Sequence, residues 1–198
     1  MSSKYILRTI VMGDSYVGKS NIVSQLCNNR YSGSSMSTLG IDFYMKTFNI
    51  CDIALKFHIW DTSGQPQYKS IVEAYYKTVD IVIICYDISN KDSFHNVRNW
   101  YDQIKGFNLD KSLIYIVGNK IDLEYSEVSI YELRDLAEEL GVNYKQLSAK
   151  DNINILELFN EICIKFLTSE PRKRKDSSIV LKQEPPIEYK NKLCNICS

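Results

Sequence analysis

The feature that most restricts the fold of this chain is an eight-residue segment near the N-terminus, residues 13–20 (GDSYVGKS). It lies between an apolar run rich in β-branched side chains, residues 5–12, and a stretch of helical character, residues 19–27. This is the strand–loop–helix setting in which the pattern G-x-x-x-x-G-K-[ST] binds phosphate groups. An ordinary glycine turn is the alternative for the segment taken alone, and a nucleotide kinase would share the pattern.

The chemistry of the segment follows from its residue types. Glycines let the backbone approach phosphate oxygens, while successive N–H groups and the helix N-terminus point at them. The Lys19 ammonium would lie at the β and γ phosphates, and the Ser20 hydroxyl would ligate Mg²⁺. The residues predicted to contact the nucleotide phosphates are therefore Gly13, Asp14, Ser15, Tyr16, Val17, Gly18, Lys19 and Ser20.

Strand-like and helix-like segments alternate along the rest of the chain. Such alternation predicts an α/β fold of the P-loop NTPase type, a mostly parallel six-stranded sheet flanked by about five helices. We expect one domain over residues 1–168 and a flexible tail over 169–198. The strands are expected at residues 5–12, 43–50, 53–60, 80–86, 112–118 and 142–147, and helices at 19–27, 92–105, 129–140 and 153–167.

Composition limits the classes of partner and compartment. The chain has 24 basic and 24 acidic residues, and this balance gives no reason to expect nucleic-acid binding. No segment approaches the roughly 20 apolar residues that span a bilayer, and the N-terminus carries no secretory pattern. Four of the six cysteines are scattered through apolar segments and are expected to be small buried side chains. The chain is therefore expected in the cytosol.

Two short motifs after later strands predict a pocket for the guanine base. In Asn119-Lys120-Ile-Asp122, the Asp122 carboxylate would accept from the ring N–H and the exocyclic amine of guanine. Adenine lacks both donors, and a site that relies on such pairing rejects the wrong base strongly. The segment Ser148-Ala149-Lys150 would complete the pocket. A chance match is a substantial alternative for the first motif alone, and much less so with the phosphate motif upstream.

A third motif, Asp61-Thr-Ser-Gly64-Gln65, ends the strand at residues 53–60. Asp61 would hold Mg²⁺, through water, the Gly64 amide would sense the γ-phosphate, and Gln65 would orient the attacking water. Thr38, in the serine-rich loop 29–40, would give Mg²⁺ a second hydroxyl. A plain loop threonine is the alternative for Thr38 taken by itself.

Together these motifs, present in order over about residues 5–168, resemble those of the Ras-like small GTPases. Within that group the chain is similar to the Rab family, in stretches such as residues 39–43 (LGIDF), 57–61 (FHIWD) and 86–90 (YDISN). The resemblance implies a GTP/GDP switch in vesicular traffic, a GTPase and hydrolase that is slow without an activating protein. It also implies effectors, an exchange factor and a GTPase-activating protein as partners.

The same resemblance implies roles for individual residues. Tyr31 matches the aromatic residue that lies against guanine, Thr38 the threonine on Mg²⁺ and γ-phosphate, and Gln65 the catalytic glutamine. Phe43, Trp60 and Tyr75 match an aromatic triad that effectors contact. Core packing is the alternative for the triad, because aromatic residues are common on strands.

Two departures from the family pattern concern hydrolysis. Tyr16 stands where the family usually has a small residue, so its ring would crowd the phosphates or an incoming arginine. Pro66 follows the glutamine where glutamate is usual, and it favours an extended backbone at Gln65. These residues motivate a second hypothesis, a GTP-binding effector platform with impaired hydrolysis.

The tail ends with two cysteines, Cys194 and Cys197, but has no cysteine fourth from the end, so the simple prenylation box is absent. By resemblance both would carry geranylgeranyl groups, with an escort and a dissociation-inhibitor protein as partners. One lipid anchors only marginally, and the basic run at residues 172–175 would add attraction to anionic lipid. The chain is then expected on the cytoplasmic face of a membrane, with a cytosolic pool. An inert tail and a metal or redox pair are the alternatives.

Overall fold

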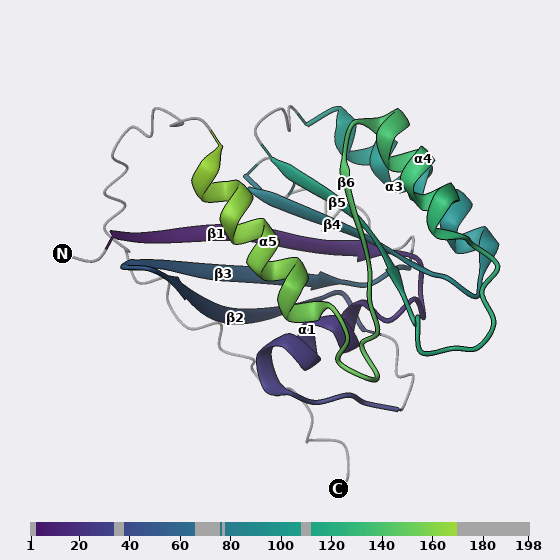
Figure 1. Cartoon of the computed structure of the whole chain (residues 1–198), viewed down its shortest axis with the longest axis horizontal. Coiled ribbons are helices and arrows are strands. Elements are labelled where there is room, and N and C mark those ends of the chain that lie inside the picture. The colour runs from purple at the N-terminus through teal and green to yellow at the C-terminus, as the bar shows by residue number, and fades with distance from the viewer. Residues whose placement is uncertain (1–2, 34–37, 66–75, 77, 108–111, 170–198) are drawn as a thin grey trace, which may run out of the picture. The chain divides into compact units, whose positions relative to one another are not determined.

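A computed structural model describes residues 3–33, 38–65, 76, 78–107 and 112–169 of the chain. Within them, strands and helices alternate as predicted (Figure 1). The strands are β1 (Ser3–Gly13), β2 (Ile41–Ile50), β3 (Ile53–Thr62), β4 (Ile81–Asp87), β5 (Leu113–Asn119) and β6 (Asn143–Gln146). The helices of the described part are α1 (Lys19–Asn28), α3 (Lys91–Lys105), α4 (Ile130–Leu140) and α5 (Ile155–Thr168).

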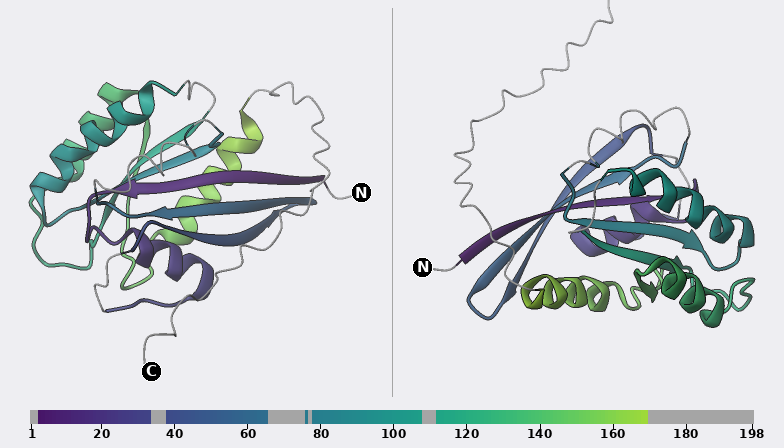
Figure 2. Two further views of the ribbon diagram at one scale, coloured as in Figure 1. Left: turned by 180° about the vertical axis from the view of Figure 1, so that it is seen from behind. Right: turned by 90° about the horizontal axis from the view of Figure 1, so that it is seen from above.

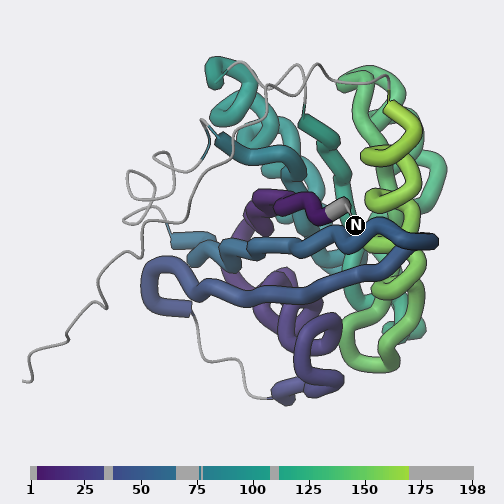
Figure 3. The backbone as a smooth tube through the Cα atoms, turned by 90° about the vertical axis from the view of Figure 1, so that its left-hand side faces the viewer, coloured from purple at the N-terminus to yellow at the C-terminus, as the bar shows by residue number. Residues whose placement is uncertain are grey.

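The six strands form one sheet in the order β2-β3-β1-β4-β5-β6. Strand β2 pairs antiparallel with β3, whereas the other neighbours are parallel. Figure 3 shows the β2–β3 hairpin, in blue, crossing the view next to α1. The predicted six-stranded, mostly parallel sheet is confirmed.

Helices cover both faces of the sheet, and the apolar core is divided accordingly (Figure 2). On one face, α1 and α5 pack through side chains such as Ile22 and Phe159 against Phe57 of β3. On the other, α3 and α4 pack against the opposite side of β1 and β4. Strand β4 is buried along its whole length, which explains why its sequence is continuously apolar.

Local sequence signals account for the helix ends. Helix α4 starts at a capping box, in which the Ser129 side chain accepts from the Glu132 amide and the Glu132 side chain accepts from Ser129. It ends at Gly141, whose left-handed backbone stops the helix. Helix α5 begins at Ile155, two residues later than predicted, because Asn152 and Asn154 adopt positive φ angles before it.

Candidate nucleotide site

Two adjoining cavities lie where the loops after β1, β3, β5 and β6 meet. The phosphate cavity, of about 330 Å³, is lined by Ser15, Tyr16, Gly18, Lys19, Ser20, Asn21, Ser24, Ser32, Thr38, Tyr44, Thr62, Ser63 and Gly64. The base cavity, of about 380 Å³, is lined by Tyr16, Gly18, Asn21, Tyr31, Ser32, Gly33, Asn119, Lys120, Asp122, Leu123, Ala149 and Lys150. Four residues line both, so the two cavities form one continuous site at the carboxyl ends of the parallel strands, where ligands of such sheets bind.

The loop at residues 13–20 depends on glycine at both ends. Gly13 has a φ of 135°, and a Cβ atom there would lie 2.1 Å from the carbonyl oxygen of Cys85 on β4. Gly18 has a φ of 96°, and a Cβ atom would lie 2.3 Å from Nδ2 of Asn119. Side chains at either position would therefore push the loop away from its neighbours, and the path taken by the loop requires both glycines.

Lys19 is buried at the floor of the phosphate cavity. Its Nζ donates to the carbonyl oxygens of Gly13, at 2.9 Å, and Asp14, at 2.6 Å. Burial lowers the pKa of the Lys19 ammonium, while the charges of nearby groups such as Asp61 and Asp14 oppose that shift. An anion that enters the cavity would favour the charged ammonium further, because an opposite charge within a few ångströms stabilises it.

Three oxygen-bearing side chains suit a hard metal ion: Ser20 and Thr38 line the phosphate cavity, and Asp61 is buried next to Ser20. The hydroxyls of Ser20 and Thr38 lie 2.8 Å apart and share a hydrogen bond. Asp61 is fully buried, and within the described residues neither of its carboxylate oxygens has a hydrogen-bond partner. Burial raises the pKa of Asp61 to about 6, although Ser20 and Lys19 oppose the shift. A buried carboxylate without partners beside two hydroxyls fits the oxygen ligand set that Mg²⁺ prefers.

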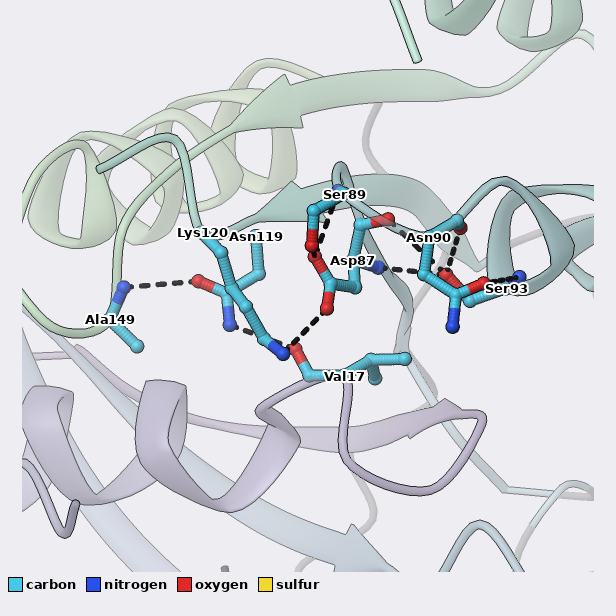
Figure 4. Close-up of polar contacts among 8 residues, drawn as sticks. All are labelled: Val17, Asp87, Ser89, Asn90, Ser93, Asn119, Lys120 and Ala149. Carbon is cyan, nitrogen blue, oxygen red and sulfur yellow. Dashed lines mark hydrogen bonds and ion pairs between the residues drawn. The ribbon is translucent and has the colours of Figure 1, made fainter. Parts of the chain in front are cut away.

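Asn119 connects the loops that form the site (Figure 4). Its Nδ2 donates to the carbonyl oxygen of Val17 at 2.9 Å, and its Oδ1 accepts from the amide of Ala149 at 3.0 Å. Both ends of its side-chain amide are therefore bonded to other loops of the protein. The residue holds the loops after β1, β5 and β6 together.

Lys120 and Asp122 follow Asn119 in the base loop. Lys120 has a positive φ of 74°, and its Nζ lies 2.5 Å from a carboxylate oxygen of Asp87 at the end of β4 (Figure 4). The Asp122 carboxylate accepts from the Ser148 hydroxyl at 2.6 Å, and its other oxygen lies 3.6 Å from Nζ of Lys150. The Asp122 side chain is only 5% exposed, so its carboxylate is fixed in one orientation beside the cavity.

Tyr16 stands between the two cavities and lines both. It is the one residue of the 13–20 loop other than glycine with a positive φ, 66°, and its side chain is 66% exposed. A left-handed backbone costs a non-glycine residue about 1–2 kcal/mol. Tyr31 also lines the base cavity and is 45% exposed.

Gly64 packs against the phosphate loop from the other side. A Cβ atom at Gly64 would lie 2.4 Å from the amide nitrogen of Ser15 and 2.5 Å from the carbonyl carbon of Asp14. The next residue, Gln65, donates its backbone N–H to the Ser63 hydroxyl at 3.3 Å. Pro66 lies outside the described residues, so its effect on Gln65 stays a prediction.

Comparison with known proteins agrees with this geometry. The sequence model of the Ras family matches residues 8–168. Ras-related protein Rab-3A of Homo sapiens is 38% identical over 159 residues, which cover 80% of this chain and 72% of the human protein. Ras-related protein Rab-3 of Caenorhabditis elegans is 37% identical, with coverages of 80% and 73%. Ras-related protein Rab-3C of Mus musculus is 35% identical over 199 residues, with coverages of 96% and 88%.

The chain belongs to the Rab family of Ras-like small GTPases. The resemblance drawn from the sequence motifs is thereby confirmed, as is the GTPase activity that it implied. Guanine nucleotide is the ligand class that the family binds. No helix in the described part of this Rab chain has the length and apolarity that a membrane crossing requires.

Two aromatic residues predicted to contact effectors lie side by side on the β2–β3 hairpin of the Rab chain. Phe43 and Trp60 are cross-strand partners, with ring centroids 5.7 Å apart. Phe43 also meets the ring of His58 edge-on at 5.4 Å, and it is 50% exposed. The Phe43 ring is thus only partly covered by the core. Tyr75, the third residue of the predicted triad, lies outside the described residues.

Sequence reasoning missed several residues that support the site. Asp87 pairs with Lys120, and the Asn21 side chain accepts from the Ser32 amide at 3.1 Å. Tyr44 lines the phosphate cavity from β2. The resemblance of residues 86–90 to the family is the sequence signal for Asp87, but nothing in those residues predicts which lysine the Asp87 carboxylate pairs with.

Replacing Asp61 by asparagine is expected to stabilise the protein freed of nucleotide and Mg²⁺, in a pH-dependent way. The folded-state pKa of Asp61 is raised from 3.8 to about 6, so the folded protein binds the extra proton between these values. Stability therefore falls as pH rises through this window. A rise of about two pKa units corresponds to on the order of 3 kcal/mol at pH 8, and the advantage of the Asp61→Asn variant should vanish near pH 4.

The measurement is urea unfolding of EDTA-treated, nucleotide-free protein at pH 4, 6 and 8. Asp52→Asn, at an exposed turn position, is the matched control and should change the unfolding free energy little at any pH. In the presence of GDP, added Mg²⁺ should stabilise the native protein and the control but not Asp61→Asn. A pH-independent effect of Asp61→Asn would contradict the raised pKa.

Proposed function

We propose that this Rab-family GTPase is a Mg²⁺-dependent GTP/GDP switch that recruits effectors in vesicular membrane traffic. The observation that carries the proposal is the continuous site formed by the phosphate and base cavities. At one end lies the carboxylate of Asp61, which has no hydrogen-bond partner among the described residues, and at the other the carboxylate of Asp122, which is held by Ser148. One end suits a metal-bound triphosphate and the other a base with two adjacent donors.

The nucleotide is assigned to the site from the phosphates outward. Backbone N–H groups of residues 13–20 would bind phosphate oxygens, and the Lys19 ammonium would exchange its two carbonyl partners for the β and γ phosphates. At the other end, Asp122 would accept two hydrogen bonds from guanine, while Ser148, Ala149 and Lys150 close the pocket beside Asn119 and Lys120. Tyr31 would lie against the base from its exposed position at the cavity rim.

Mg²⁺ would be held by the hydroxyls of Ser20 and Thr38, with Asp61 bound through a water molecule. The short distance between the two hydroxyls and the lack of partners for Asp61 among the described residues support this assignment. The ion supplies positive charge that offsets the charge of the β and γ phosphate oxygens.

Hydrolysis requires a water molecule in line with the γ-phosphorus. The Gln65 side chain would orient that water, and the Gly64 amide, which lies against the phosphate loop, would bind the γ-phosphate. When the γ-phosphate leaves, Thr38 and Gly64 lose a shared partner, so the segments that carry them are released and effectors dissociate. Intrinsic turnover is expected on the order of 10⁻⁴ to 10⁻² per second, and an arginine from an activating protein would add about 10³ to 10⁵.

The proposal is tested by identifying the nucleotide released when the purified protein is denatured, followed by single-turnover hydrolysis of GTP. Bound GDP or GTP and phosphate release above the buffer control support the switch. Bound guanine nucleotide without phosphate release, with and without activating proteins, would instead support the platform with impaired hydrolysis. Protein that carries no guanine nucleotide and cannot be loaded would exclude both.

The Tyr16→Gly variant examines the residue that motivates the platform hypothesis. Removing the strained left-handed tyrosine should stabilise the protein by up to about 1 kcal/mol, because the strain of 1–2 kcal/mol exceeds the entropy that glycine loses. If the ring obstructs an incoming arginine, hydrolysis stimulated by an activating protein should accelerate about tenfold or more, with intrinsic hydrolysis little changed. Equal stimulated rates for Tyr16→Gly and the native protein would exclude the obstruction.

Effector binding is proposed for the surface around Phe43 and Trp60, with Tyr75 as its third aromatic residue. The half-exposed Phe43 ring, in contact with Trp60, offers the apolar anchor that interfaces favour. Exchange factors, which reload GTP, and activating proteins are proposed as further partners by family membership.

Membrane attachment is proposed through geranylgeranyl groups on Cys194 and Cys197, which lie outside the described residues. An escort protein would present the chain for modification, and a dissociation inhibitor would maintain a cytosolic pool. Mass spectrometry of protein from the membrane fraction of eukaryotic cells should find prenyl groups, and their loss in Cys194→Ser/Cys197→Ser should move the protein to the cytosol. Unmodified cysteines on membrane-bound protein would contradict the assignment.

A further inference from the structure

The side chain of Asp14, in the phosphate loop, points away from the phosphate cavity toward helix α3. One carboxylate oxygen accepts from Nδ2 of Asn96 at 2.8 Å, and the other accepts from Nε1 of Trp100 at 2.7 Å. Asn96 and Trp100 are four residues apart and therefore lie on the same face of α3. Two neutral donors thus bind both oxygens of one charged group, an arrangement we call the Asp14 clamp.

The backbone of Asp14 is equally constrained, but by the nucleotide site. Its carbonyl oxygen accepts from the Lys19 ammonium at 2.6 Å. A Cβ atom on Gly64 would lie only 2.5 Å from its carbonyl carbon, so the start of the segment after β3 packs directly against it. Asp14 therefore joins three parts of the molecule: helix α3, the lysine predicted to bind phosphate, and the glycine predicted to sense the γ-phosphate.

Helix α3 is itself held firmly at its first turn, close to the base end of the site. The Ser93 hydroxyl accepts from the amide of Asp87 at 3.1 Å, and the Asn90 side chain caps the helix by accepting from the Ser93 amide at 3.0 Å. The Asp87 carboxylate pairs with Lys120 of the base loop (Figure 4). Because α3 is fixed at the base end, the Asp14 clamp, within the next two turns of the helix, can hold the phosphate loop at a defined distance from the base loop.

We propose that Asn96 and Trp100 are positioning residues that hold the phosphate loop in its binding geometry and so prolong the residence of GDP and GTP. The proposal rests on the nucleotide-binding role proposed above. Without the clamp, the Asp14 carboxylate loses two charge-assisted hydrogen bonds, and the loop that carries it is no longer fixed to helix α3. The phosphate loop, whose backbone N–H groups would bind phosphate oxygens, is then held less firmly, and the phosphates are bound less well.

The test compares GDP release from four proteins, measured by displacement of a fluorescent GDP analogue in the presence of Mg²⁺. Trp100→Phe keeps an aromatic ring but removes the indole donor, and Asn96→Ala removes the other donor. Each should accelerate release on the order of 3- to 10-fold, which is part of the roughly 10-fold or more that one hydrogen bond to a charged group contributes. Tyr101→Phe is the matched control, because it removes the neighbouring α3 hydrogen bond from Tyr101 to the Leu140 carbonyl, at 3.4 Å, and leaves the clamp intact. It should release GDP at the native rate.

A double-mutant cycle separates the clamp from general loosening of the helix. In an Asp14→Ala background, Trp100→Phe should have no further effect on GDP release, because the group that it positions is gone. Additive effects of the two substitutions would overturn the proposal. Circular dichroism and thermal unfolding of each variant confirm that it is folded.

Comparing the effect of the substitutions on two ligands separates positioning of the phosphate loop from a general loss of structure. The clamp acts on the phosphate loop, so Trp100→Phe and Asn96→Ala should weaken GDP binding severalfold while leaving the much weaker binding of GMP nearly unchanged. Equal weakening of both, or GDP release within twofold of the native rate in both variants, would overturn the proposal while leaving the nucleotide site intact. Failure of the native protein to retain any guanine nucleotide would overturn the proposed function, and this inference with it.

Discussion

Asp122→Asn is expected to change the base preference of the protein from guanine to xanthine. Affinity for GDP should fall by about 10² or more, because a site that pairs polar groups rejects ligands that leave those groups unmatched. The carboxylate is nearly buried and is held by Ser148, so it cannot turn away from the base. An asparagine in the same position would donate to the carbonyl that replaces the exocyclic amine in xanthine, so XDP affinity should rise.

Isothermal titration with GDP and XDP measures both changes. Asp151→Asn is the matched control, since it makes the same chemical change at an exposed aspartate three residues after Ser148. The control should keep the native affinity for GDP and should show no increase in affinity for XDP. Native GDP affinity in Asp122→Asn would contradict the assignment of the base cavity.

Lys19→Met is expected to lower the affinity for GTP by on the order of 10² to 10⁴, the equivalent of two charge-assisted hydrogen bonds. Methionine keeps much of the length of the side chain but has no charge to place at the phosphates. The lysine is already desolvated, and burial lowers its pKa, so little hydration is lost when phosphate replaces its carbonyl partners. The gain on binding should therefore be large.

Competition binding with GTP, GDP and GMP measures this loss of affinity. The loss should be large for GTP and GDP, and small for GMP, which has neither a β nor a γ phosphate. Lys91→Met, at an exposed lysine paired with Glu132 on the surface, should bind all three like the native protein. A Lys19→Met protein that binds GTP within threefold of the native affinity would show that the ammonium does not reach the phosphates.

Much of the fold was predictable because local sequence signals agree with it. The continuously apolar run of β4 predicts a strand buried on both faces, and the capping box and glycine around α4 predict the ends of that helix. The start of α5 was not predictable in the same way. Two asparagines, Asn152 and Asn154, take left-handed backbones there, and a sequence pattern does not distinguish such turns from a first helical turn.

The site was predictable as a set of loops but not as a set of contacts. The phosphate and base motifs have fixed spacing, so their residues could be named from the sequence. Contacts between distant segments have no such signal: Asn119 bonds to Val17, 102 residues earlier, and Trp100 to Asp14, 86 residues earlier. The Asp14 clamp and the pairing of Asp87 with Lys120 depend on how the strands are ordered in the sheet, so they became visible only in the structure.

The two bonds of the Asn119 side chain have a consequence for how the halves of a nucleotide act on each other. Because one amide contacts Val17 in the phosphate loop and Ala149 in the base pocket, a ligand that orders either loop lowers the entropy still to be lost when the other is filled. A nucleoside and a pyrophosphate should thus bind with positive cooperativity, and an intact nucleotide gains from this coupling as well as from its own covalent linkage. The slow release expected of the bound nucleotide would then result from the two loops acting together.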